Sequence, residues 1–103
     1  MKKVITAAQA IHLEQIPNIG PAMVKDFRLL EIFNPSQLVG RDPYALYLQL
    51  CQLTRSRHDP CVIDTLIAAV RFMEGSPALP WWHYTAERKA YLETHPKLQS
   101  PLS

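Results

Sequence analysis

The sequence has few glycines, few cysteines, little net charge and no long apolar run. Three glycines in 103 residues are too few for a flexible, low-complexity chain. Two cysteines are too few for a secreted disulfide scaffold, and no run of about 20 apolar residues is present to cross a bilayer. Lys2 and Lys3 precede an apolar pair that Thr6 interrupts, which is not typical of a signal peptide. We therefore expect a cytoplasmic protein with no membrane partner.

The charge balance also limits the kind of nucleic-acid contact. Eleven Lys and Arg against nine Asp and Glu give a net charge of +2, far from that of a polybasic arm. Contact with nucleic acid would depend on placed backbone amides and a few cations.

What the sequence does contain is 48% hydrophobic residues and nine prolines, several of them at helix starts. Proline follows Asn, Asp or Gly where a helix is expected to begin, and no strand-like alternation occurs. These signals predict an all-α domain over residues 1–93 and a flexible tail over 94–103. The predicted helices span residues 7–15 (after a Thr6–Gln9 capping box), 21–30, 35–39, 43–53, 60–74 and 85–93, the last capped by Thr85. Leu46, Leu50 and Leu53 form one predicted stripe, and helix 60–74, apolar nearly all round, should occupy the centre of the core.

The most informative stretch runs from residue 16 to residue 28. Pro17 should end the first helix, Asn18 and Gly20 tolerate positive φ in a tight turn, and Pro21 suits the first position of the next helix. The amides of Gly20, Ala22 and Met23 should then be free at a helix N-terminus, where an anion such as phosphate is attracted. Lys25, one turn on, and Arg28 would add positive charge.

Leu13, Ile16, Pro17, Ile19 and Gly20 resemble the helix-hairpin-helix motif of DNA-binding proteins that lack sequence specificity. Asn18 stands where the first glycine of that motif is usual, and Asn is the best substitute for a left-handed glycine. Residues 40–44, 59–61 and 80–82 extend the resemblance to a bacterial family described as pathogenicity-locus or mitomycin-resistance proteins. The resemblance covers roughly residues 10–90.

This resemblance implies a tandem helix-hairpin-helix fold, completed by a central and a C-terminal helix, that binds the DNA backbone weakly. The second hairpin, at residues 40–43, should be degenerate, because the Asp42 carboxylate occupies the place of a phosphate and leaves Arg41 as its one contact. The expected nucleic-acid-binding residues are Asn18, Ile19, Gly20, Ala22, Met23, Lys25, Arg28 and Arg41.

Other interpretations remain open at this stage. The hairpin can be a packing device in a protein-interaction module, and the resemblance implies that its carbonyls can also hold a monovalent cation. Trp81 and Trp82 can either staple the last helix to the core or stack on bases. Cys51, His58 and Cys61 are zinc-compatible ligands, but their spacing matches no common zinc module, and both cysteines fit apolar helix faces. Asp42 is more simply a helix cap than a catalytic group. We expect no enzyme activity, no metal and no cofactor.

Overall fold

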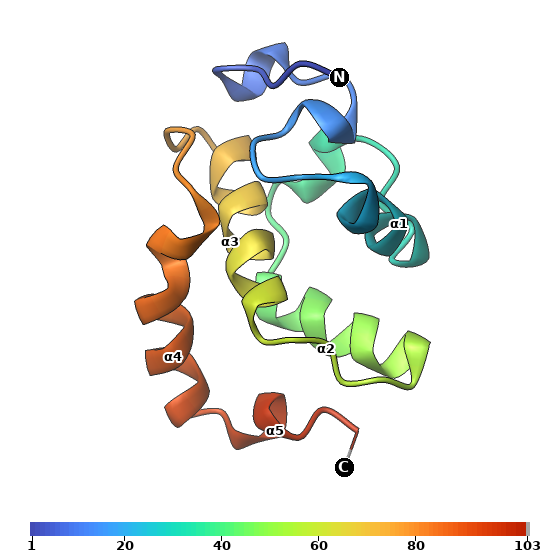
Figure 1. Ribbon diagram of the computed structural model, residues 1–103, viewed down its shortest axis with the longest axis vertical. Coiled ribbons are helices and arrows are strands. Elements are labelled where there is room, and N and C mark those ends of the chain that lie inside the picture. Colours follow the sequence, from blue (N-terminus) through green and yellow to red (C-terminus); the bar gives the residue numbers. More distant parts are fainter. Residues whose placement is uncertain (103) are drawn as a thin grey trace.

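Helix α3, Cys61–Met73, runs through the middle of the molecule in the computed structural model, which describes residues 1–102 (Figure 1). It packs against helices α2 (Pro43–Thr54) and α4 (Thr85–Glu93), and against the 3-10 segments η1 (Ala7–Gln9), η3 (Pro35–Leu38) and η4 (Trp81–Tyr84). Eight of its residues are buried, so its apolar surface packs against other elements on several sides. This confirms the predicted core helix.

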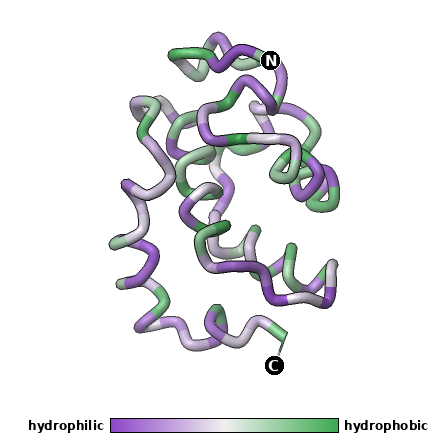
Figure 2. Tube along the Cα trace, in the orientation of Figure 1, coloured by the Kyte–Doolittle hydropathy of each residue, from purple (hydrophilic) through white to green (hydrophobic). Residues whose placement is uncertain are grey.

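The remaining elements are η2 (Leu13–Gln15), α1 (Pro21–Leu29) and the short helix α5 (Pro96–Gln99). Residues 1–102 contain no strand, so the all-α prediction is confirmed. Within the same residues, no helix is long and apolar enough to cross a membrane. Along the helices that surround α3, hydrophobic and hydrophilic residues are interspersed (Figure 2).

The predicted helix at residues 7–15 is wrong, because two separate turns, η1 and η2, take its place. Each turn carries its own glutamine cap. The Gln9 side-chain oxygen accepts hydrogen bonds from the Ile5 and Thr6 amides at 3.0 and 3.1 Å. Gln15 repeats this pattern with the amides of the two residues that precede η2, each at 2.9 Å. A second cap so soon after the first starts a new turn and prevents one continuous helix.

Two smaller expectations are also corrected. Leu53 is 54% exposed, so the α2 stripe consists of Leu46 and Leu50 without it. Thr85 begins α4 but does not cap it, since Tyr84 holds the cap position. The Thr85 hydroxyl instead donates to the Asp64 carboxylate at 2.7 Å.

The C-terminal segment, expected as a tail over 94–103, contains helix α5 as far as the structure describes it; Ser103 lies outside the described residues. Leu98 is buried, and the Gln99 side chain donates to the Leu92 carbonyl of α4 at 2.6 Å. These contacts fold the segment back across the ends of α4 and α2.

Candidate nucleic-acid interface

The first turn, at residues 16–20, is fixed by two buried isoleucines and by Asn18. Ile16 and Ile19 are almost completely buried, which anchors both ends of the turn in the core. Asn18 adopts the left-handed conformation at φ 72°, as its place in the motif predicts. Its side-chain amide donates to the Leu79 carbonyl at 2.9 Å and accepts from the Trp81 amide at 3.3 Å. Asn18 thus holds the turn against the proline-rich connector between α3 and α4, residues 76–84, and its side chain both donates and accepts a hydrogen bond there.

Helix α1 begins with three backbone amides that have no acceptor within residues 1–102: those of Gly20, Ala22 and Met23. Pro21 has no amide N–H, no side chain caps this end of α1, and the first helical turn of α1 carries no acidic residue. The positive end of the helix is therefore open, which is the arrangement that binds an anion. The structure confirms this geometry of the three amides.

Gly20 itself is not required by backbone conformation. Its φ of −104° and ψ of −176° are extended values that any residue adopts, so the turn does not use the tolerance of positive φ at Gly20. A Cβ added there would meet nothing within 4 Å. The glycine leaves open space beside the free amides, which lets a bulky ligand approach them closely.

The cations of α1 are exposed, but they are not equally close to the amides. Lys25 lies one turn into the helix, whereas Arg28 lies in its last turn, about 10 Å along the axis from Pro21 at 1.5 Å per residue. Neither side chain forms an ion pair within the described residues. Lys25 can serve the same anion as the amides, and Arg28 would reach a different phosphate.

The second turn, at residues 39–42, has two carboxylates beside it, where the turn at residues 16–20 leaves amides free. Gly40 is left-handed at φ 78°, and its amide donates to the Glu74 carboxylate at 2.9 Å. Asp42 caps α2 by accepting from the Tyr44 amide at 2.9 Å. Two carboxylates at this turn repel phosphate. Arg41 lies here, half-buried, with no hydrogen bond or ion pair from its side chain to the first turn within residues 1–102.

One residue of the first turn's surroundings was missed by sequence reasoning. The Lys3 ammonium donates to the backbone carbonyls of Glu14, Ile16 and Ile19, directly behind the turn. Desolvation lowers the pKa of Lys3, and the nearby Glu14 carboxylate partly offsets this effect. No local pattern signals this contact, because Lys3 lies 11 to 16 residues from its acceptors.

The tryptophans of the connector differ in exposure. Trp81 is half-buried and packs edge-to-face with Trp82 at 5.6 Å between ring centroids, while Trp82 is 64% exposed. Tyr84 is buried instead, and the Arg71 guanidinium lies over its ring at 5.7 Å. The connector therefore joins α4 to α3 through Trp81 and Tyr84. Trp82 remains exposed to solvent next to Trp81, whose amide donates to Asn18.

The cysteines do not form a cluster of metal ligands. Cys51 is buried and Cys61 is half-buried, both as free thiols, and residues 1–102 contain no group of three or more His, Cys, Asp or Glu suited to a metal ion. The Cys51 sulfur accepts from the His58 amide at 3.5 Å. The Cys61 sulfur lies 3.8 Å from the Arg88 guanidinium, away from the apolar core where we expected it.

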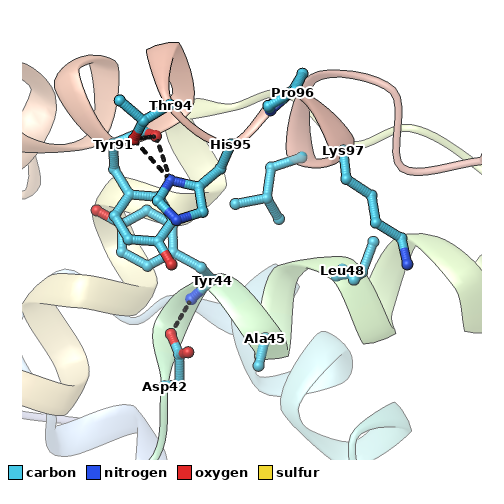
Figure 3. Close-up of a pocket in the computed structure, with 10 residues that line it drawn as sticks. Asp42, Tyr44, Ala45, Leu48, Tyr91, Thr94, His95, Pro96 and Lys97 are labelled. Atoms are coloured by element: carbon cyan, nitrogen blue, oxygen red, sulfur yellow. Dashed lines mark hydrogen bonds between the residues drawn. The ribbon is translucent and has the colours of Figure 1, made fainter.

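A hollow of about 440 Å³ lies where α2, α4 and α5 meet, apart from the first turn (Figure 3). The stacked rings of Tyr44, Tyr91 and His95, with centroids 3.6 and 3.7 Å apart, form one wall. The other wall carries Leu48 and Lys97 (Figure 3). The His95 Nδ1 lies 2.9 Å from the Thr94 hydroxyl oxygen and 2.8 Å from the Tyr91 carbonyl oxygen, and these contacts fix the orientation of the ring in the stack.

Comparison with known proteins places this sequence in a family. The sequence model of the family described as "Pathogenicity locus" (Cdd1) matches residues 6–90. The chain belongs to the pathogenicity locus family. The match covers the first turn, the second turn and the connector, so the family predicted from residues 10–90 is confirmed.

A curated relative of this pathogenicity locus protein is described as "Mitomycin resistance protein McrB", from Streptomyces lavendulae. The two are 40% identical over 88 residues, which make up 85% of this chain and 84% of the relative. No solved structure gives a significant match. The helix-hairpin-helix interpretation of the two turns stays a prediction, since a single 3-10 turn, η2, precedes the first of them.

Proposed function

We propose that this pathogenicity locus protein binds the backbone of nucleic acid, more specifically DNA, without sequence specificity, through the first turn. The observation that carries the proposal is the set of three unpaired amides at the start of α1, beside an exposed lysine and the open space at Gly20. Phosphate is the common ligand of such a site. An accessory role in repair, recombination or DNA uptake in the cytoplasm, where free thiols persist, fits this mode of binding.

In this proposal, the residues expected from the sequence have four roles. Gly20, Ala22 and Met23 donate amides to one phosphate, with Lys25 adding charge. Asn18 and Ile19 act by holding the turn in place. Arg28 contacts a second phosphate, and Arg41 is peripheral. None of these side chains is suited to reading base edges, so phosphate contacts dominate and sequence preference is slight.

The experiment is a titration of labelled duplex and single-stranded DNA with the wild-type protein and with Lys25→Glu. Wild-type affinity should be on the order of 10⁻⁴ to 10⁻⁶ M at physiological salt. Lys25→Glu should abolish binding while thermal unfolding stays unchanged, because the side chain is exposed and unpaired. Lys89→Glu, the same charge change on the exposed side of α4, is the matched control and should bind with only modestly reduced affinity. Unchanged affinity in Lys25→Glu would reject the turn as the site.

A second candidate function, a protein-interaction module with a purely structural turn, is favoured by one observation: the exposed indole of Trp82. Large exposed aromatics are enriched at protein interfaces. A pull-down after nuclease treatment, with the wild type, Trp82→Ala and Lys25→Glu, separates the two functions. If Trp82→Ala removes a protein partner that survives nuclease treatment, and Lys25→Glu retains it, the second function replaces the first.

A further inference from the structure

The hollow between α2, α4 and α5 contains an aromatic stack with one free face. The rings of Tyr44 and Tyr91 are stacked with 9° between their planes, and those of Tyr91 and His95 with 5°. Tyr91 is therefore the middle ring, and one face of His95 is covered. The opposite face of His95 stacks on no other ring within residues 1–102, and His95 is exposed to solvent. Another flat ring can extend the stack on this face.

The His95 ring is held in this position before any ligand arrives. Its Nδ1 lies 2.8 Å from the Tyr91 carbonyl oxygen, which only accepts hydrogen bonds, so Nδ1 carries the proton and donates. The buried side chain of Leu98 anchors the segment that follows, α5. A platform that is already fixed loses little conformational entropy when a ligand stacks on it.

Two charges of opposite sign lie at the edge of the hollow. The Asp42 Oδ1 accepts from the Tyr44 amide at 2.9 Å, while Oδ2 receives no hydrogen bond within residues 1–102. The Lys97 ammonium has no hydrogen bond or ion pair in the described part of the chain. Figure 3 shows the two charged groups on different sides of the hollow. A matching ligand carries an N–H donor at one end, an anionic group at the other and a flat ring between them.

We propose that this hollow binds a free purine mononucleotide. The base stacks on the free face of His95, its amino group donates to Asp42, and its phosphate pairs with Lys97. Bases stack on aromatic side chains, carboxylates accept from base amino groups, and lysine binds phosphate as a point charge. The volume of about 440 Å³ lies within the range of roughly 300 to 1,000 Å³ that is usual for small-molecule sites.

The number of cations selects a mononucleotide over a longer strand. Lys97 is the one Lys or Arg that lines the hollow within residues 1–102, so a single phosphate finds a cationic partner there. The larger ring system of a purine also covers more of the platform than that of a pyrimidine.

This site is independent of the proposed function. The hollow lies apart from the first turn, and much of its lining comes from residues 91–98, beyond residues 6–90 that the family model matches. The nucleotide site is therefore built with a part of the chain that the family match does not describe.

The test is a calorimetric titration of the wild type with guanosine 5′-monophosphate (GMP), guanosine and ribose 5-phosphate. GMP should bind with a dissociation constant on the order of 10⁻⁵ to 10⁻³ M. Guanosine, which lacks the phosphate, should bind about fivefold more weakly. Ribose 5-phosphate, which lacks the base, should bind at least about tenfold more weakly. No saturable binding of GMP below about 10 mM, or ribose 5-phosphate binding as tightly as GMP, would overturn the proposal.

A lysine variant assigns the binding to the hollow. Lys97→Met should bind GMP about fivefold more weakly and leave guanosine affinity unchanged, because only the phosphate contact is lost. Lys2→Met makes the same change at an exposed lysine at the other end of the molecule (Figure 1). This matched control should bind GMP like the wild type. Full GMP affinity in Lys97→Met would remove the hollow as the site.

A nucleotide phosphate also fits the free amides of α1, so Lys25→Glu is titrated as well. This variant should bind GMP with wild-type affinity while it loses DNA. If Lys25→Glu loses GMP and Lys97→Met retains it, the nucleotide lies at α1 and the inference fails. GMP binding in the hollow of a wild type without DNA affinity would remove the proposed function and keep the nucleotide site.

A measurement on the wild type needs no variant. GMP stacked on His95 should shift the ring-proton signals of His95 upfield in nuclear magnetic resonance spectra. The amide signals of Gly20, Ala22 and Met23 should stay in place. The reverse pattern, with shifts at these amides and none at His95, would contradict the site in the hollow.

Discussion

At the scale of single residues, Asn18 and Gly20 in the first turn are predicted from the sequence for the same reason but serve different purposes. Asn18 and Gly20 both tolerate positive φ, yet Asn18 alone uses it. The sequence predicts which residues tolerate positive φ but not which of them adopt it, since the φ of each residue is set by the path that the chain takes in the fold. The side chain of Asn18 is needed for the connector, whereas Gly20 provides only space.

Gly20→Ala therefore separates packing from binding. The free energy of unfolding should stay constant or rise by up to about 1 kcal/mol, because the native φ suits alanine and the unfolded chain loses freedom. DNA affinity should fall by roughly tenfold, or about 1.4 kcal/mol, because the methyl group obstructs the approach to the amides. Gly40→Ala is the reverse control: it should destabilise the protein, since φ is +78° there, and leave affinity unchanged. Urea unfolding measures the free energy of unfolding of each variant, and DNA titration measures its affinity. Full DNA affinity in Gly20→Ala would favour a packing role for the turn.

Cys61 also departs from the expected residue-level role, and the departure predicts a pH dependence. Hydrogen bonding to Asp59, together with desolvation, raises the pKa of the Cys61 thiol above its usual value of 9.0. Because the thiolate is the reactive form, alkylation of Cys61 should be slow at pH 7 and accelerate only above pH 9. Asp59→Asn should shift this rise to lower pH. Buried Cys51 should stay unreactive across the range unless the protein unfolds. Alkylation followed by mass spectrometry gives both rates, and a Cys61 that reacts rapidly at pH 7 would contradict the raised pKa.

At the scale of elements, α3 and α4 are joined by a buried ion pair that their sequences do not predict. Asp64 is fully buried, and the Arg88 guanidinium donates to its carboxylate at 2.8 and 3.3 Å. The side-chain hydrogen bond to Asp64 raises the pKa of Arg88, so the guanidinium stays charged. Asp64 occurs in an otherwise apolar helix, and its partner lies 24 residues away; helical periodicity carries no information about such a pair.

Arg88→Met should therefore destabilise the protein by about 3 to 5 kcal/mol, because it leaves a buried carboxylate without its partner. The double change Asp64→Leu with Arg88→Met should recover most of this loss, since no charge remains buried. Arg71→Met is the matched control. Its pair with Glu87, at 2.6 Å, is more than 40% exposed on both sides, so the loss should be about 1 kcal/mol or less. Urea unfolding measures all three, and a double variant as unstable as Arg88→Met would show that packing, not charge, is responsible.

At the scale of the whole molecule, the sequence predicts the elements with strong local signals and misses contacts between distant segments. Proline with a preceding Asp or Gly marks the starts of α1 and α2 within a residue, and the apolar surface of α3 places it in the core. The first turn follows from Pro17, Asn18 and Pro21. In contrast, the hydrogen bonds of the Lys3 ammonium to the carbonyls behind the first turn and the packing of Leu98 depend on segments brought together only by folding, so no local pattern can indicate them.

The whole-molecule charge gives the last prediction, which concerns salt. A net charge of +2 supplies little long-range attraction, so affinity for DNA should come from the few phosphates that Lys25, Arg28 and Arg41 neutralise. Each neutralised phosphate contributes about −0.9 to the slope of log affinity against log salt for duplex DNA, which gives a slope of about −2 to −4. Lys25→Met should make this slope shallower by about 1, while Lys97→Met, at the distant hollow, should leave it unchanged. Titrations at several salt concentrations measure the slopes. A slope steeper than about −6 would mean that a larger basic surface binds the DNA, and equal slopes for the wild type and Lys25→Met would place the phosphate contacts away from α1.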